Sequence, residues 1–258
     1  MAANKQMLTP IQRHMLNMFI ALRWGVGLAG LALPVILAGV GYLEYKIPLS
    51  GSMSAYYHAT ESCSGQTAED GLKDPAKAPA ACFAPGTGPM RNWFVGSLFF
   101  IGGAMLLMRG FSVWEDLALN IAGVTAPCVA LFPMSWIGQS GFNPHMTFAV
   151  IFFLSVGFTA VFCSEKTLKE IPPQTPNREK LIAFFRLWYR VLGFLMVALP
   201  LFAHLVLAQF VARTFMVEAA GVWAFGSYWL FKTFELKRSD IEIRALTGQL
   251  NPNRRNLS

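Results

Sequence analysis

The sequence contains one long segment without any Asp, Glu, Lys or Arg, which lies between Asp116 and Glu165. A transmembrane helix needs about 20 apolar residues to cross roughly 30 Å of hydrocarbon, so this segment is too long for a single crossing. The stretch SWIGQSGFNP, residues 135–144, interrupts it with polar residues, Gly and Pro. The segment therefore predicts two membrane-spanning helices, near 117–136 and 145–163.

Four other apolar stretches predict further spans, and one of them contains a single acid, Glu218. The composition agrees, because only 14% of the residues are charged, against about 25% in soluble domains. We therefore predict an all-α fold, a polytopic membrane helix bundle that forms one domain. The six predicted transmembrane helices are 24–43, 92–108, 117–136, 145–163, 191–212 and 214–231.

The positions of the basic residues predict the orientation of the bundle. If the N-terminus is cytoplasmic, sixteen of the 21 Lys and Arg residues fall on the cytoplasmic side. The positive-inside rule then places both termini in the cytoplasm, residues 44–90 in an extracytoplasmic loop and residues 232–258 in a cytoplasmic tail. We expect the plasma (inner) membrane as the location. The net charge of +7 does not predict nucleic-acid binding, because the basic residues form no single dense run.

Two of the four cysteines, Cys63 and Cys82, lie in the predicted outer loop. An extracytoplasmic location is oxidising, so we predict that they form a disulfide bond that stabilises the protein by about 3 kcal/mol. Cys128 and Cys163 fall inside predicted spans and are expected to pack as small apolar residues. Near the C-terminus, Ser239 and Glu242 have the spacing of a capping box that would start a short surface helix.

Polar and aromatic side chains gather at the predicted outer surface. Ser54, Tyr57 and His58 belong to the sequence SMSAYYH, Arg91 precedes the second span, and Glu218 lies inside the last span. An ionisable group within a span is costly and is by default a functional hypothesis. Hydroxyl groups and a guanidinium suit an anion, so this cluster predicts binding of a lipid headgroup, a small ligand or a partner membrane subunit. The other interpretation is that the aromatic residues and the arginine are ordinary interfacial anchors.

Three histidines, His58, His145 and His204, are predicted to lie on this same side of the membrane. Three neutral imidazoles with an open fourth position are a known arrangement for catalytic zinc. The alternative function is therefore a zinc-dependent membrane hydrolase that acts on a lipid or an amide at the outer leaflet. The three histidines have no motif spacing, however, and a simpler prediction is that His204 contacts Glu218 across the turn between the last two spans.

Several segments resemble a known group of proteins when they are taken in order along the chain. They are SMSAYYH, RNWFVGSLFFIGGAMLLMRGF, DLALNIAGVTAPCVALFP, H-xxx-AVIFFLSVGF and E-xxx-VWAFGSYWL. Together they resemble bacterial six-helix integral membrane proteins without an assigned activity, and distantly the damage-regulated autophagy modulator type of six-span protein. The resemblance covers most of residues 45–231, except 59–89. It implies the six-helix fold and no particular activity.

A second similarity concerns Ser54 and His58 alone. Their Ser-x3-His spacing is similar to that of the superfamily holding alkaline ceramidases and progestin/adiponectin receptors, which contains zinc-dependent hydrolases with seven spans. This sequence lacks the paired His-x3-His of that superfamily and has one predicted span fewer. The similarity therefore assigns no catalytic role to either residue.

Overall fold

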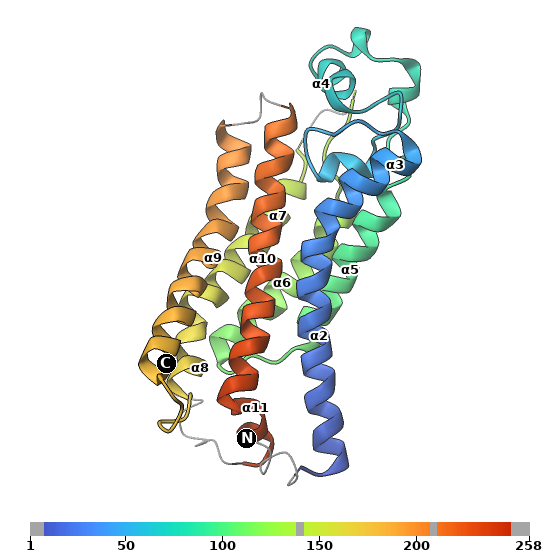
Figure 1. Ribbon diagram of the computed structural model, residues 1–258. Coiled ribbons are helices and arrows are strands. Elements are labelled where there is room, and N and C mark those ends of the chain that lie inside the picture. Colours follow the sequence, from blue (N-terminus) through green and yellow to red (C-terminus); the bar gives the residue numbers. More distant parts are fainter. Residues whose placement is uncertain (1–7, 138–141, 207–210, 249–258) are drawn as a thin grey trace.

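The structure, a computed structural model, describes residues 8–137, 142–206 and 211–248. The side chains of residues 203 to 213, both included, are not described. All regular secondary structure in the described residues is helical, so the prediction of an all-α chain is confirmed. The helices run along one another in an elongated bundle (Figure 1).

Within the described residues, six long helical segments make up this bundle, and shorter helices lie at its two ends. Four of the long segments are single helices: α5 (Arg91–Leu107), α6 (Val113–Leu131), α9 (Arg178–Val206) and α10 (Val211–Ser239). The first segment consists of α2 (Pro10–Val35), η1 (Ile36–Val40) and α3 (Gly41–Tyr45), which follow one another without a break. In the same way, the fourth segment consists of α7 (His145–Phe158), η5 (Thr159–Cys163) and α8 (Ser164–Lys169). The short helices are η2 (Ser54–Tyr57), α4 (Gly65–Lys73), η3 (Pro75–Lys77), η4 (Ala80–Phe83) and α11 (Ile241–Leu246).

Three of the described helical segments are long and apolar enough to cross a membrane, judged by length and composition. These segments are Pro10–Tyr45, His145–Lys169 and Arg178–Phe202. The helix Arg91–Leu107 is also apolar but shorter. Large apolar side chains point away from the bundle on several helices, for example Leu107 and Phe194. A helix that carries apolar residues on its outer face is suited to lipid rather than water.

The six long segments form a closed ring in which each packs mainly against two others. The order around the ring is α2, α5, α6, α7, α9, α10 and back to α2. Glycines allow close approach at the crossings: a methyl group on Gly226 of α10 would lie 2.7 Å from the carbonyl oxygen of Gly27 in α2. Small residues at such contacts are typical of helices that associate in lipid, where van der Waals packing replaces the hydrophobic effect.

The observed helix ends differ from the predicted ones where polar residues act locally. The first helix begins at Pro10, well before predicted residue 24, because Thr9 and Gln12 form a capping box there. Helix α6 ends at Leu131, so the last residues of the predicted span 117–136 are not helical. A break is expected here, because Pro133 has no N–H to continue the helix.

The predicted capping box near the C-terminus is wrong, although the short helix α11 exists. The Ser239 hydroxyl donates to the carbonyl oxygen of Leu236 within α10, and Asp240 turns the chain in a left-handed conformation. Glu242 forms an ion pair with Arg23 of α2, with the two atoms 2.7 Å apart. The Ser239 hydroxyl is therefore used within its own helix and Glu242 is used by a tertiary partner, so the expected box does not form.

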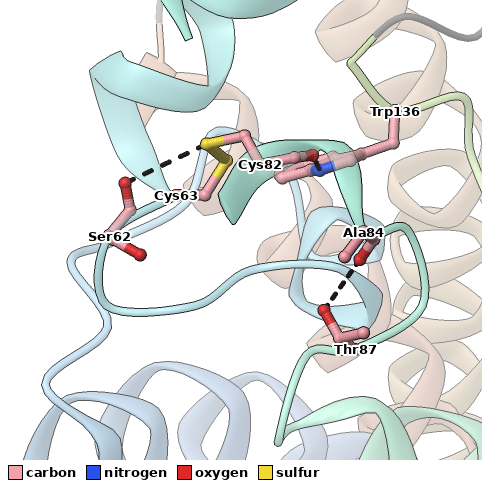
Figure 2. The surroundings of a disulfide bond; sticks show 6 residues. All are labelled: Ser62, Cys63, Cys82, Ala84, Thr87 and Trp136. Carbon is pink, nitrogen blue, oxygen red and sulfur yellow. Dashed lines mark hydrogen bonds between the residues drawn. A yellow bond between two sulfur atoms is a disulfide. The ribbon is translucent and has the colours of Figure 1, made fainter. Parts of the chain in front are cut away.

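Residues 46–90 fold into a compact cap on one end of the bundle, which we call the cap end; α11 lies at the opposite, tail end (Figure 1). The predicted disulfide between Cys63 and Cys82 is present in the cap. Trp136, from the α6–α7 connection, donates its indole N–H to the carbonyl oxygen of Cys82 at 3.0 Å (Figure 2). Trp136 and both cysteines are buried in one small apolar cluster, so the disulfide joins the two halves of the cap directly over the bundle.

Removing this disulfide is expected to destabilise the cap. The Cys63→Ala/Cys82→Ala variant should lose about 2–3 kcal/mol of folding free energy, because the bond closes a loop of 19 residues in the unfolded chain. Alanine is chosen over serine because both positions are buried, where a hydroxyl group would be costly. Thermal unfolding in detergent, with Cys128→Ala as the control at a free cysteine, measures the difference. Equal melting temperatures for the two variants would contradict the prediction.

Candidate functional site

His58 ties the cap to the α6–α7 connection. Its Nε2 lies 3.1 Å from the carbonyl oxygen of Met134, and its Nδ1 accepts a hydrogen bond of 2.7 Å from the N–H of Gly86. The imidazole is stacked on the ring of Trp136 with centroids 5.0 Å apart. Burial lowers the pKa of His58, and the Met134 hydrogen bond opposes this shift. A neutral ring with its proton on Nε2 satisfies both hydrogen bonds.

Tyr57 and Arg91 lie beside His58 and complete the same cap cluster. The guanidinium carbon of Arg91 lies 5.2 Å from the centroid of the Tyr57 ring, and Arg91 also donates to the carbonyl oxygen of Gly86 at 3.4 Å. Three of the five residues predicted to bind a ligand, Tyr57, His58 and Arg91, therefore contact one another and hold the cap. The other two, Ser54 and Glu218, lie elsewhere, at a cavity inside the bundle.

His145 begins α7 and makes a polar contact that the sequence did not predict. Its Nε2 lies 2.8 Å from the hydroxyl oxygen of Ser54, 91 residues earlier in the chain. Its Nδ1 lies 3.0 Å from the carbonyl oxygens of both Val129 and Phe132. Only a protonated Nδ1 can donate to these oxygens, so in the neutral ring Nε2 is the acceptor and Ser54 is the donor.

The end of α6 explains why two carbonyl groups are available to this histidine. In a continuing helix the Val129 carbonyl would accept from the N–H of residue 133, but Pro133 has none. The carbonyl of Phe132 also has no helical partner, because α6 ends at Leu131. Asn143 helps to fix His145 in this place, because its side-chain oxygen accepts a hydrogen bond of 2.8 Å from the N–H of His145.

Glu218 of α10 holds the turn that carries Ser54. Its carboxylate accepts a hydrogen bond of 2.9 Å from the Ser52 hydroxyl and one of 2.8 Å from the N–H of Met53. The Ser52 hydroxyl oxygen in turn accepts from the N–H of Ser54 at 3.2 Å. The predicted contact between Glu218 and His204 stays a prediction, since the side chain of His204 lies outside the described residues.

A cavity of about 120 Å³ lies below Ser54 in the interior of the helix ring. Every long helix contributes to its walls, and among the described side chains its only polar ones are those of Ser54, His145 and Glu218. Two lining residues of α7, Met146 and Leu154, are also 37% and 48% exposed, so the cavity reaches the outer apolar surface of the bundle. The remaining lining residues are Leu33, Met53, Phe94, Leu98, Ile101, Ala126, Val129, Ala149, Val150, Phe152, Phe153, Val197, Pro200, Leu201, Val222 and Phe225.

The described residues do not assemble the zinc site that three histidines could form. Both ring nitrogens of His58 and of His145 are engaged by protein groups, as described above. Among the described residues no group of three His, Cys, Asp or Glu side chains is arranged to hold a metal ion. The place of His204 in such a site is not tested.

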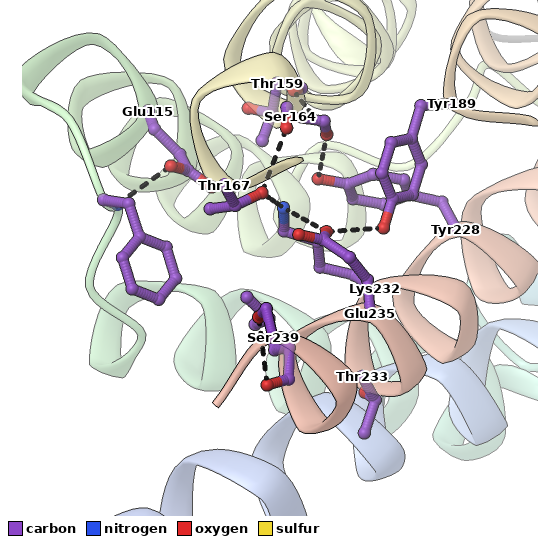
Figure 3. Close-up of polar contacts among 12 residues, drawn as sticks. Glu115, Thr159, Ser164, Thr167, Tyr189, Tyr228, Lys232, Thr233, Glu235 and Ser239 are labelled. Carbon is purple, nitrogen blue, oxygen red and sulfur yellow. Dashed lines mark hydrogen bonds and ion pairs between the residues drawn. The ribbon is translucent and has the colours of Figure 1, made fainter. Parts of the chain in front are cut away.

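A second polar cluster, at the tail end, was also not predicted from the sequence. The Lys232 ammonium donates to the Thr167 hydroxyl at 2.5 Å and to the Glu235 carboxylate at 2.8 Å (Figure 3). The Tyr189 hydroxyl donates to the same carboxylate oxygen at 2.7 Å. All four side chains are buried, so this cluster, which we call the lysine network, links α8, α9 and α10. In the sequence, only the spacing of three residues between Lys232 and Glu235 indicates that these two side chains could form an ion pair on one helix.

The two polar centres therefore differ in character. The lysine network pairs its charges within the protein, and its Lys232 and Thr167 also border a larger cavity of about 1170 Å³ at the tail end. Ser54 and His145 border a smaller cavity with mainly apolar walls, which suits part of an apolar ligand. Comparisons of the chain with protein-family models, with curated proteins and with solved structures found no match.

Proposed function

We propose that this chain is a six-helix integral membrane protein that binds the acyl chain of a lipid in the cavity below Ser54. In this proposal both termini are cytoplasmic, the membrane is the plasma (inner) membrane, and the cap lies on its outer side. The excess of basic residues in the segments at the tail end supports this orientation. The apolar residues on the outer faces of the helices support burial of the bundle in lipid.

The observation that carries the proposal is the contrast between the walls of the cavity and its cap end. The walls are apolar, which suits a hydrocarbon chain, and three polar side chains meet at one end. The Ser54 hydroxyl and the polar end of the cavity can contact the ester or carboxyl group of a lipid whose chain lies below. Because Met146 and Leu154 are also exposed on the outer face of α7, a chain can enter sideways from the bilayer.

A photoreactive lipid tests the proposal. Val222 follows Glu218 by one helical turn and lines the cavity, so Val222→Phe adds a ring where the chain is proposed to lie. We expect crosslinking of a phospholipid with a diazirine in its acyl chain to fall about tenfold in this variant, and the crosslinked peptides in the unmodified chain to include the cavity walls.

The matched control is Val124→Phe, the same substitution at a side chain of α6 that is 54% exposed. It adds the same ring to the outer surface instead of the cavity, so it should leave crosslinking unchanged. If both variants crosslink like the unmodified chain, the lipid contacts only the outer surface and the proposal is wrong. A reduction that depends on the headgroup of the lipid, and not on its chain, would instead assign the site to headgroup binding.

A further inference from the structure

We infer that Ser54 is a nucleophile and that His145 is its general base, in acyl transfer from a lipid ester. The inference rests on the proposed lipid-binding function, because the cavity must present the ester to the hydroxyl. It adds to that function a covalent step on Ser54.

The geometry of the pair is that of an activated serine. A nucleophilic hydroxyl needs a base within about 2.6–3.2 Å, and a third group that orients the base. The hydroxyl of Ser54 is 2.8 Å from Nε2 of His145. The carbonyl oxygens of Val129 and Phe132, each 3.0 Å from Nδ1, take the orienting role that a carboxylate has in other hydrolases. They fix the proton on Nδ1 and leave the lone pair of Nε2 to receive the proton of the serine.

The surroundings favour reaction at the hydroxyl over a purely structural hydrogen bond. His145 is only 6% exposed and Ser54 is half-buried, and both side chains border the cavity. A ligand in the cavity can therefore reach the hydroxyl and its base together. Ser54 is also held in place, since Glu218 binds the preceding residues Ser52 and Met53. A fixed nucleophile gains from proximity, because little motion must be frozen in the transition state.

The step balances with an ester and water as the reactants. The Ser54 oxygen bonds to the carbonyl carbon of the ester while its proton passes to Nε2 of His145. The bond between the carbonyl carbon and the alcohol oxygen then breaks, and the imidazolium returns the proton to the leaving alcohol. This leaves the acyl group on Ser54. Water attacks it, with His145 taking the proton of the water and returning it to Ser54 as the fatty acid leaves.

A long-chain alkyl fluorophosphonate tests the inference on the full chain in detergent micelles. The probe phosphonylates activated serines, and we expect it to modify Ser54, located by peptide mapping. Ser54→Ala should remove the modification. His145→Gln should slow it by about 100-fold or more, because a general base contributes a factor of that size. Ser155→Ala is the matched control, since the Ser155 hydroxyl donates to its own helix at Ile151 and lies outside the cavity lining.

The outcomes separate this inference from the lipid-binding proposal. If the photoreactive lipid crosslinks to the cavity but Ser54 is not modified, the nucleophile inference is overturned and lipid binding stands. Modification of Ser54 at the same rate in His145→Gln would overturn the role of His145 as base. Retained lipid crosslinking in His145→Gln shows that the variant is folded, so a slow rate in that variant then supports the inference. If neither probe reacts in the unmodified chain, both proposals are wrong.

Discussion

Replacing Lys232 with methionine is expected to destabilise the protein by about 3–5 kcal/mol, because it leaves the buried Glu235 carboxylate without its cation. Lys232 is 2% exposed and Glu235 is 0% exposed, so the carboxylate that loses its cation is buried inside the protein. Methionine fills a similar volume, which keeps the loss of packing small. Unfolding of the purified protein in mixed micelles with increasing denaturing detergent measures the change.

The double variant Lys232→Met/Glu235→Leu provides the control for this prediction. It removes both charges, and replacing a buried ion pair by apolar residues is often close to neutral. We expect it to recover most of the stability that Lys232→Met loses, although Tyr189 then loses its acceptor. A double variant that is as unstable as the sum of the two single variants would show that the charges do not act as a pair.

The second large effect is expected at the crossing of α5 and α6. Gly102→Leu should destabilise the bundle by about 3 kcal/mol or more, because its Cβ would meet the side chain of Pro127 and lie 2.6 Å from the carbonyl oxygen of Gly123. Backbone atoms in a packed helix cannot give way as a flexible side chain can. The helices must therefore move apart, which opens the ring on this side.

The neighbouring Gly103 supplies a matched control in the same helix. No atom lies within 4 Å of the place where its Cβ would stand. Gly103→Leu should therefore fold, and it should gain up to about 1 kcal/mol from the better helix propensity of leucine. The yield of monodisperse protein and its melting temperature in detergent measure both variants. Equal stability of the two would mean that the close crossing does not limit the packing of α5 on α6.

The helical bundle could be predicted from the sequence because long apolar helices leave a strong one-dimensional signal. The charge-free segment after Asp116 contains α6 and α7, and the stretch 135–144 does separate them. The disulfide was predictable because only Cys63 and Cys82 lie in the loop outside the predicted spans. These inferences need only local composition and the thickness of a bilayer.

The arrangement of the site could not be predicted, because it depends on contacts between distant parts of the chain. Ser54 and His145 were both selected as candidates, but with separate roles, and their pairing depends on where α6 ends. Tyr57 and His58 were predicted to bind a ligand, and their contacts with Arg91 and Gly86, which hold the cap, could not be read from the sequence. Lys232 was predicted to begin the tail because a charge usually ends a span; α10 continues past it to Ser239, and the Lys232 side chain is buried, which the sequence did not predict.

The closed ring of helices has a consequence for the order in which the protein can assemble. The ring closes where α2 meets α10, the first and last of its long helices, and Trp223 of α10 donates to the carbonyl oxygen of Leu31 in α2 at 3.0 Å. A contact between such distant segments forms late, because the whole intervening chain must first be in place. During synthesis the glycine face of α2 around Gly27 therefore has no partner until α10 has emerged. In the proposed membrane location, lipid or an insertion factor would cover that face of the nascent chain until its last long helix arrives.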